Sequence, residues 1–407
     1  MSQAFWNCPW LLGLRCPGLC GLGCARVSGL GGARRSGFGR CVRFPIGLVI
    51  ALLTYLLTSN AVAASLYWST GVDGKIQRYD LTLGQVEDVI SGGIGQARSI
   101  ALDLEFGRLY WTDSGSGSIR RANLDGTDVE DVTTGLQRPT AIAIDQSNGK
   151  VYWSDTLTNQ IQRSGLDGEN LETVVNDAVG TSSIIIDSPS NQFFWLDSSN
   201  QVGTIQRSDL DGGNSQVVRE TDGIPTSLAI DFTNDQLYWA IFDDPDSGKA
   251  GVFTAPEGVG VPEKLSSDVT AALALALFQD RLFFSVFPGG KILRHDLITG
   301  DNEPLVSFAG ILPIGLAINP LVEGDATFDL LVNNDDFQVI KNFYRQGDRR
   351  SQGDLNFDRT VDLNDLILLK ANFGAQGNAA GNQVPEPSTI VLTLLGFVCL
   401  FLRPRTK

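Results

Sequence analysis

The stretch Leu109-Tyr110-Trp111-Thr112-Asp113 decides the fold, because variants of it recur along the chain at a regular interval. The other copies are Leu66-Tyr67-Trp68-Ser69, Val151-Tyr152-Trp153-Ser154, Phe193-Phe194-Trp195-Leu196, Leu237-Tyr238-Trp239-Ala240 and Leu282-Phe283-Phe284-Ser285. The third residues of consecutive copies, from Trp68 to Phe284, are 43, 42, 42, 44 and 45 positions apart. Six copies with a period of about 40 to 45 residues predict an all-β fold, a six-bladed β-propeller with four strands in each blade.

Each repeat also has a constant internal order. The aromatic strand is followed by a second strand that closes in an Asp-Gly pair, at Asp125-Gly126, Asp167-Gly168 and Asp211-Gly212. Asp-Gly is a hairpin signal because its turn needs a positive φ. A short outer strand such as 171–175 and a nearly all-apolar run such as 140–145 come next. Because this run does not alternate, we expect an inner strand that is buried on both faces. Its equivalents are 99–103, 183–187, 227–231 and 315–319.

The two ends of the repeat region predict how the ring closes. The first repeat has no inner strand before its aromatic strand, whereas the last repeat ends with one, at 314–318. We therefore expect this last strand to complete the first blade. Such closure leaves no exposed sheet edge between the first and last blades.

These motifs resemble the class B repeat of the low-density-lipoprotein-receptor family, the YWTD propeller, over residues 65–320. The resemblance implies an extracellular module that binds proteins or controls conformation and is not an enzyme. The Asp that follows the aromatic strand in this family is matched by Asp113, Asp155 and Asp197. The first, fifth and sixth copies have Thr70, Ile241 and Val286 instead. We therefore infer the fold of this chain from the resemblance, but not the identity of its binding partner.

A second recurring acid has two interpretations. Asp103, Asp145, Asp187 and Asp231 each precede a Trp by eight residues. They are either a ring of metal ligands or caps of the turns between inner and aromatic strands. Their repetition in step with the blades favours the structural interpretation. The Tyr-Trp pairs are likewise expected to pack between blades.

A shorter repeat lies between residues 324 and 374, where 324–336 aligns with 353–365 at an offset of 29. Oxygen ligands at loop positions 1, 3, 5, 9 and 12, with a backbone carbonyl at position 7, suit calcium. An amphipathic helix is expected after each loop, at 337–344 and 366–373. The pair of loops resembles the type I dockerin repeat. The implied ligands of the second loop are Asp354, Asn356, Asp358, Asp362 and Asp365, with the carbonyl of Thr360; those of the first are Asp325, Thr327, Asp329, Asn333 and Asp336, with the carbonyl of Leu331.

Both loops lack the usual Gly at position 6, where Leu330 and Arg359 stand. A left-handed backbone there costs a non-glycine residue roughly 1 to 2 kcal/mol, so we expect weakened calcium binding. The alternative is an acidic turn and helix without an ion. The module is expected either to dock to a cohesin-like module or to act as a calcium-rigidified stalk. Residues 375–383 are predicted to be a flexible linker.

The N-terminal region predicts export. A basic, acid-free stretch at 1–43 leads into an apolar run at 44–57 and then Ala61-Val62-Ala63. This order predicts a secretory signal peptide over residues 1–63, with an uncleaved anchor as the alternative. Because the basic region is long, a translation start nearer the apolar core is a further hypothesis. Five of the six cysteines precede residue 64 and the sixth is Cys399, so residues 64–383 contain no disulfide.

The C-terminal region, 384–407, combines Pro385-Glu386-Pro387, an apolar stretch at 389–402 and a basic end. It resembles the PEP-CTERM sorting signal, which implies processing by an exosortase-type membrane protease. As a helix, the fourteen residues of this stretch reach only about 21 Å, short of the roughly 30 Å hydrocarbon core. This length favours a transient signal over a plain tail anchor.

The charge and the residue composition exclude some classes of partner and of catalytic site. Without its two ends the chain carries 22 basic and 45 acidic side chains, a net charge of about −23, which disfavours nucleic acid and anionic lipid and suits cations. We expect no nucleic-acid partner and membrane contact only through the terminal segments. The chain has a single histidine, His295, expected at the surface, and no Ser-centred nucleophile elbow.

The leading interpretation is therefore a non-catalytic protein, secreted or displayed on the surface of a Gram-negative-type bacterium. Its propeller is expected to bind an extracellular protein or polysaccharide. The alternatives are a calcium-dependent hydrolase or lactonase of the six-bladed propeller type, including a site made of Asp and Glu alone, and a dockerin-borne component of polysaccharide degradation.

Overall fold

A computed structural model describes residues 64–374, apart from 72, 82, 200–202, 244–247, 259, 267–268, 270, 309–311, 321–324 and 328–330. The chain divides into two units, 1–59 and 60–407, and all the described residues belong to the second. The predicted signal peptide, the linker at 375–383 and the sorting signal at 384–407 therefore lie outside the described residues.

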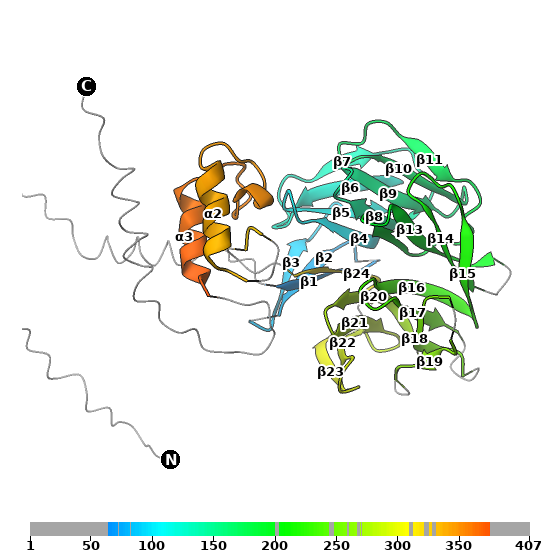
Figure 1. Ribbon diagram of the computed structural model, residues 1–407. Coiled ribbons are helices and arrows are strands. Elements are labelled where there is room, and N and C mark those ends of the chain that lie inside the picture. The colour runs from blue at the N-terminus through cyan, green and yellow to red at the C-terminus, as the bar shows by residue number, and fades with distance from the viewer. Residues whose placement is uncertain are drawn as a thin grey trace, which may run out of the picture. The chain divides into compact units, whose positions relative to one another are not determined.

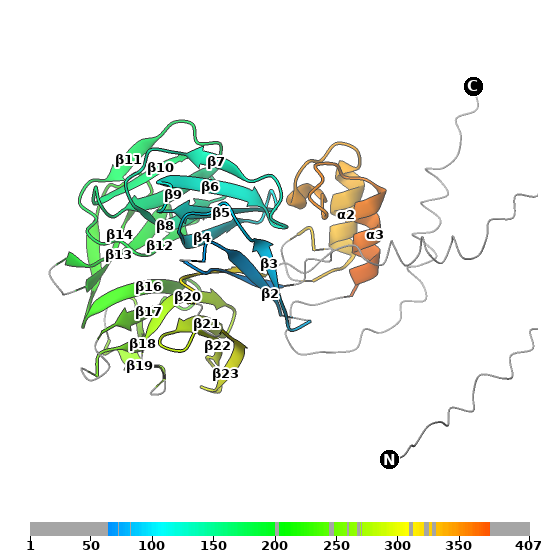
Figure 2. The ribbon, with the colours of Figure 1, turned by 180° about the vertical axis from the view of Figure 1, so that it is seen from behind.

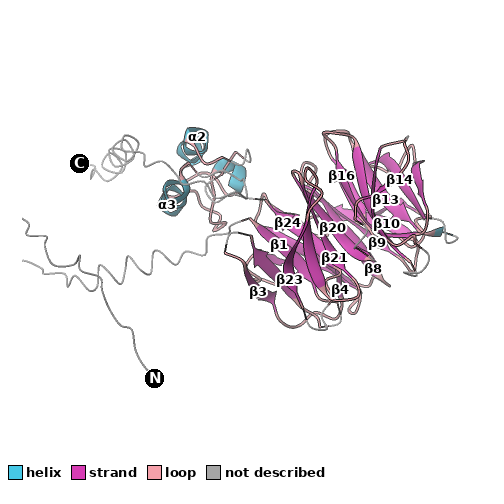
Figure 3. Cartoon of the chain, turned by 90° about the horizontal axis from the view of Figure 1, so that it is seen from below, coloured by secondary structure: helices cyan, strands magenta, loops and turns pink. Residues whose placement is uncertain are grey.

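Residues 65–319 form six antiparallel sheets of four strands arranged as a ring (Figures 1 and 3). The prediction of a six-bladed all-β propeller is confirmed. Blade 1 contains β24 (Gly315–Asn319), β1 (Ser65–Ser69), β2 (Ile76–Asp80) and β3 (Gln85–Ile90), and blade 2 contains β4 (Ala97–Asp103), β5 (Arg108–Asp113), β6 (Ser118–Asn123) and β7 (Glu130–Thr133). Blade 3 contains β8 (Pro139–Asp145), β9 (Lys150–Asp155), β10 (Gln160–Gly165) and β11 (Glu172–Val175).

The remaining three blades have the same order. Blade 4 contains β12 (Ile184–Asp187), β13 (Gln192–Asp197), β14 (Gly203–Asp209) and β15 (Gln216–Thr221). Blade 5 contains β16 (Ile224–Asp231), β17 (Gln236–Phe242), β18 (Gly251–Pro256) and β19 (Glu263–Lys264), and blade 6 contains β20 (Ala272–Phe278), β21 (Arg281–Val286), β22 (Lys291–Asp296) and β23 (Asn302–Ser307). Inner strands β4, β8 and β16 start before the predicted apolar runs. In each of them the pairing with the aromatic strand shifts register near the start of the inner strand, and the first residue of the strand is still paired beyond that shift.

The ring closes as the sequence predicts. Strand β24 pairs antiparallel with β1, from Ser65 opposite Asn319 to Ser69 opposite Gly315. The last strand of the propeller thus supplies the inner strand of the first blade (Figures 1 and 3), and Figure 2 shows the same ring of blades from behind. This pairing removes the edge that β1 otherwise exposes.

The aromatic strands form the packing between blades. Trp68, Trp111, Trp153, Trp195 and Trp239 are at most 1% exposed. The hydroxyl groups of Tyr67, Tyr110 and Tyr152 donate to the carbonyl oxygens of Leu124, Leu166 and Leu210, each in the following blade. The expectation that the Tyr-Trp pairs pack between blades is confirmed, and the polar end of each Tyr adds a hydrogen bond to that packing.

The Asp-Gly turns also contact the neighbouring blade. Gly126, Gly168 and Gly212 have φ values of 85°, 89° and 87°. A Cβ atom on each would lie 1.9 to 2.1 Å from a backbone oxygen of the preceding blade's outer strand. Glycine is therefore required both for the turn and for the close approach of two blades.

Two helices, α2 (Asn334–Phe343) and α3 (Leu363–Asn372), follow the propeller, with a 3₁₀ turn at Arg350–Gln352. Both helices begin three residues before the predicted starts at 337 and 366. The reason is a capping box in each: Asn333 with Asp336, and Asp362 with Asp365. Their shared core consists of Ala326, Val332, Ile340, Leu355, Val361 and Leu369. Within the described part of the chain, no helix has the length and apolar character needed to cross a membrane.

Candidate functional site

The Asp residues that follow the aromatic strands are structural caps. Asp113 accepts hydrogen bonds from the backbone N–H groups of Gly95 and Gln96, at 2.9 and 2.8 Å. Asp155 and Asp197 make the equivalent bonds to Gln137 and Val179. Burial opposes the charge of Asp113, but the backbone N–H groups prevail and hold the pKa of this carboxyl below its usual value. These three acids hold the chain in place ahead of the inner strands β4, β8 and β12.

The second set of recurring acids caps turns, as the structural interpretation predicts. The Oδ1 atom of Asp103 accepts from the N–H groups of Glu105 and Phe106, and that of Asp231 accepts from Thr233 and Asn234. The equivalent bonds of Asp145 and Asp187 come from the N–H groups of Asn148 and Ser190. Every member of the set thus fastens the turn between an inner and an aromatic strand.

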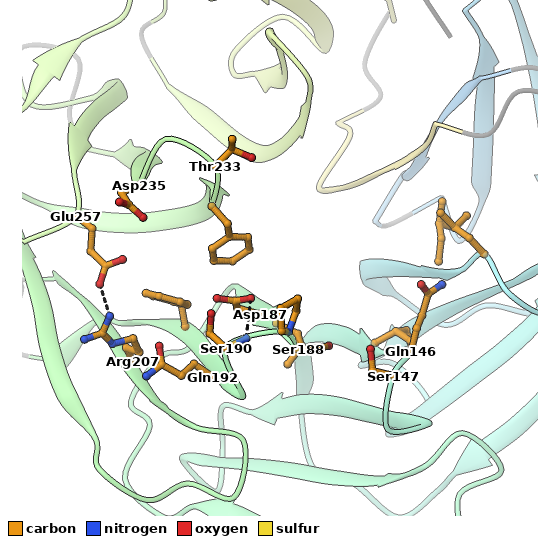
Figure 4. Close-up of a pocket in the computed structure, with 17 residues that line it drawn as sticks. Gln146, Ser147, Asp187, Ser188, Ser190, Gln192, Arg207, Thr233, Asp235 and Glu257 are labelled. Carbon is orange, nitrogen blue, oxygen red and sulfur yellow. Dashed lines mark hydrogen bonds and ion pairs between the residues drawn. The ribbon is translucent and has the colours of Figure 1, made fainter. Parts of the chain in front are cut away.

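A pocket of about 700 Å³ opens beside these turns in blades 2 to 5 (Figure 4). Inner-strand residues Leu102, Ile144 and Ile186 line it and are partly exposed. The expectation that inner strands are buried on both faces is therefore wrong at this end of the propeller. The inner strands pack side by side around the axis, and their last residues face the opening between the turns.

The residues that give the pocket its chemistry do not repeat. The position after the capping Asp is Leu104, Gln146, Ser188 and Phe232 in successive blades, and all four line the pocket. Sequence reasoning concentrated on the repeated positions and missed these residues. The available signal was that the residue after the capping Asp differs between repeats while the Asp itself does not. Repeats keep the residues that the fold requires, and positions free of that requirement can differ from blade to blade.

The second acidic loop turns its carboxylates toward its own backbone. Asp354 accepts from the N–H groups of Asp358 and Arg359, at 3.1 and 2.9 Å, and Asp365 accepts from Leu355 at 2.7 Å. The other predicted ligands lie in the same loop: Asn356 and Thr360 both hydrogen bond to Asp358, and Asp362 caps α3. Burial first, and then the charge of Asp365, raises the pKa of Asp354 to about 6; burial likewise raises the pKa of Asp365 to about 6. The loop thus holds the carboxyl groups of Asp354 and Asp365 close together and largely shielded from water.

Arg359, at loop position 6, has a φ of 67°. It therefore adopts the left-handed conformation that the sequence analysis expected to be strained without a glycine. Position 6 is where a calcium loop usually carries glycine for its sharp turn.

The first loop is described only in part, because Asp329 lies outside the described residues. Asp336 accepts from the N–H groups of Ala326, Thr327 and Asn333, and the Thr327 hydroxyl bonds to both Asp325 and Asp336. Asn333 caps α2, and Leu331 is 40% exposed. In the described ranges no three or more His, Cys, Asp or Glu side chains are grouped so as to hold a metal ion.

Comparison with known proteins identifies one repeat. Residues 107–146 match the family model of the low-density lipoprotein receptor repeat class B. The matched segment is therefore similar to a class B repeat. It runs from the aromatic strand of blade 2 to the inner strand of blade 3, so the class B unit is offset from the blade by one strand. Because each repeat ends with the inner strand of the next blade, the last repeat ends with the inner strand of the first blade, β24.

A solved structure described as the "Crystal structure of Nidogen/Laminin Complex" has the same fold. The match has a TM-score of 0.56 and 20% sequence identity, and it covers 63% of this chain and 98% of that chain. At this identity the likeness establishes a shared fold alone.

Blades that lack the class B Asp stabilise the same position differently. Ile241 is 2% exposed and packs in a hydrophobic cluster, and Val286 packs in another. The hydroxyl of Thr70 accepts from the N–H of Lys75 at 3.1 Å. These three copies of the YWTD motif have exchanged a polar cap for apolar packing or a local turn.

The position of His295 corrects the expectation of a surface residue. His295 is 2% exposed, and its Nδ1 atom lies 2.9 Å from Oδ1 of Asn302. It lies in β22 between Leu282 of β21 and Asn302 of β23. The side chain points to the buried face of the YWTD blade, and the sequence period alone did not distinguish that face.

Proposed function

We propose that this protein is a non-catalytic binding protein displayed outside the cell, whose propeller presents a face to an extracellular protein or polysaccharide. The observation that carries the proposal is the 700 Å³ pocket, lined by side chains that differ between otherwise repeating blades. Pockets of about 300 to 1,000 Å³ are typical of ligand sites. The similar solved chain belongs to a complex of nidogen with laminin, which supports a protein as the partner.

A cross-linking experiment tests this proposal. A photoreactive amino acid replaces Gln146 in the pocket or, as the control, the exposed Glu220 of β15. The full-length variants are illuminated on intact cells of the source organism. We expect a discrete cross-linked extracellular product from position 146 and none from position 220. Identical products from both positions, or a lactonase activity that the Gln146 substitution abolishes, would contradict a binding face at the pocket.

The proposal includes a calcium-binding, dockerin-like module at residues 324–374. Its support is the oxygen-rich second loop, the left-handed Arg359 and the raised pKa values of Asp354 and Asp365. Desolvated carboxylates in one loop repel one another, and a divalent cation removes that repulsion. Calcium requires these carboxylates to exchange some of their backbone hydrogen bonds for the ion. The module then serves as a stiff stalk or docks to a cohesin-like module.

Calorimetric titration of the full chain with calcium tests the module. The double variant Asp354→Ala, Asp365→Ala is compared with Asp335→Asn, which changes an exposed carboxylate outside the ligand set. We expect the double variant to lose the calcium heat and Asp335→Asn to retain it. Calcium binding that persists in the double variant would place the ion elsewhere.

The proposal places the protein at the surface of a Gram-negative-type bacterium, exported by residues 1–63 and sorted by residues 384–407. At the N-terminal end the support is a basic stretch, an apolar run and small residues, in that order. At the C-terminal end it is Pro-Glu-Pro, an apolar stretch and a basic end. Fractionation of cells that express the chain with Glu386→Ala tests the sorting step. We expect the variant to remain in the membrane fraction as a longer polypeptide, because an exosortase-type enzyme no longer processes it. Unchanged processing would remove the sorting signal from the proposal.

A further inference from the structure

The pocket in blades 2 to 5 carries uncompensated negative charge. It is lined by three carboxylates, Asp187, Asp235 and Glu257, and by one guanidinium, Arg207. Arg207 is already engaged: its Nη1 donates to Glu257, and its guanidinium carbon lies 5.8 Å from the ring centroid of Phe194. The charges of Asp187 and Asp235 therefore have no counter-ion within the pocket.

The turn caps show how Asp187 differs from Asp145 and Asp231, its equivalents in blades 3 and 5. In blades 3 and 5 the third residue after the capping Asp is Asn148 or Asn234, and its side-chain amide donates to the second carboxylate oxygen, at 2.8 and 2.7 Å. Blade 4 has Ser190 there, and only its backbone N–H reaches Asp187, at 3.4 Å. Asp187 keeps most of its capacity to accept hydrogen bonds, and Figure 4 shows its carboxylate toward the middle of the pocket.

Asp235 approaches the pocket from blade 5. It is exposed, it has a φ of 52°, and its carboxylate makes no hydrogen bond to any residue that the structure describes. The neighbouring Phe232 is 41% exposed, and its ring centroid lies 5.9 Å from that of Phe194. Two carboxylates with spare acceptors thus stand beside an open aromatic face.

We infer that this pocket receives a basic side chain, an arginine or lysine, from an extracellular protein partner. This inference rests on the proposed binding function of the propeller and specifies the chemistry of its partner. A guanidinium or ammonium group gains charge-assisted hydrogen bonds from carboxylates and a cation–π contact from an aromatic face. The net charge of about −23 on the chain between its two ends attracts a basic partner over a longer range. The hydroxyl of Ser147 and the amide of Gln146 also line the pocket and can make neutral hydrogen bonds beside the cation.

Fluorescence anisotropy with the full chain tests the inference. The probes are two labelled short peptides that differ at one central residue, arginine or its neutral analogue citrulline, and a labelled neutral polysaccharide, dextran. We expect saturable binding of the arginine peptide, at least about tenfold tighter than that of the citrulline peptide. The binding should weaken as the salt concentration rises.

The pocket variant is Asp187→Asn, Asp235→Asn. Asparagine retains the oxygen that caps the Ser190 turn and tolerates the left-handed conformation at position 235. The control, Asp177→Asn with Glu220→Gln, removes the same charge from two exposed acids whose side chains make no hydrogen bond among the described residues. We expect the pocket variant to weaken arginine-peptide binding by about tenfold or more and the control to leave it unchanged.

Three results would overturn the inference: equal binding of the two peptides, an equal loss in both variants, or no binding of the arginine peptide. Dextran binding that the pocket variant abolishes, without peptide binding, would replace the basic partner with a polysaccharide. That outcome would leave the proposed binding function standing. The cross-linking at position 146 is independent of the probe chemistry, so its failure would count against the binding function itself.

Discussion

The hydroxyl of Tyr152 donates a hydrogen bond of 3.1 Å to the carbonyl oxygen of Leu210, 58 residues further along the chain. The guanidinium of Arg163 joins the same contact, at 2.8 Å from the Tyr152 hydroxyl and 2.7 Å from the Leu210 carbonyl. This three-residue contact connects blade 3 to blade 4, and Tyr67 and Tyr110 make the corresponding bonds between earlier blades. The propeller is thus joined by polar contacts as well as by its buried Trp residues.

Removal of the Tyr152 hydroxyl should destabilise the propeller modestly. We expect Tyr152→Phe to lower the free energy of unfolding by about 1 kcal/mol, because Arg163 still satisfies the Leu210 carbonyl. Urea unfolding followed by tryptophan fluorescence measures the change. Arg163→Met with Tyr152→Phe should cost more than the single variant, because the carbonyl then loses both donors. A double variant no less stable than Tyr152→Phe would show that the contact contributes little.

The Asp-Gly turns allow a test of close blade packing. Gly168 has a φ of 89°, and a Cβ there would lie 2.0 Å from the Val132 oxygen, whereas Gly135 has a φ of 79° and open space around it. We expect Gly135→Ala to cost about 1 to 2 kcal/mol of unfolding free energy, from backbone strain alone. Gly168→Ala should cost clearly more, because the two blades must also move apart. Thermal unfolding measures both variants. Equal losses of stability in the two would show that the close approach of the blades at Gly168 adds no steric cost.

The closing strand should be essential for the ring. A chain that ends at Pro313 lacks β24 and leaves the edge of β1 unpaired, whereas a chain that ends at Pro320 keeps it. We expect the shorter chain to aggregate or to unfold without a cooperative transition, and the longer one to unfold cooperatively. Both are made without residues 1–63, and scanning calorimetry compares them. Cooperative unfolding of the shorter chain would show that closure by β24 is dispensable.

The second loop should make the module sensitive to pH. The folded-state pKa values of Asp354 and Asp365 are raised to about 6, above the ordinary value of 3.8. The folded module therefore binds more protons than the unfolded chain between these values, and calcium-free stability should fall as the pH rises from about 4 to about 6. Calcium needs the ionised carboxylates, so its affinity should rise over the same interval.

Helical circular dichroism of the full chain, with calcium or with a chelator, measures that effect. The variant Asp354→Asn, Asp365→Asn should have calcium-free stability that is nearly independent of pH over this interval. If the chelated protein is most stable at neutral pH, the raised pKa values do not control the module.

Several elements of the fold could be predicted because their signals are local. An amphipathic helix was expected at 366–373, after the second loop, but its true start at Leu363 depends on the capping box between Asp362 and Asp365. The turn-capping Asp residues were predicted from their position eight residues before each Trp. His295 was placed on the wrong face, because a strand in an outer hairpin alternates and the period alone does not say which face packs on the next blade.

The sequence by itself determined the number of blades, the order of strands within each blade and the return of the last strand to the first. Those conclusions follow from a repeat whose period equals one four-stranded sheet, with a strand missing at its start and present at its end. Only the tertiary structure decided that Asp187, Asp235 and Phe232 share one pocket. They come from turns of blades 4 and 5 that meet because inner strands pack side by side around the axis. That juxtaposition depends on how neighbouring sheets pack against each other, and no spacing along the chain encodes it.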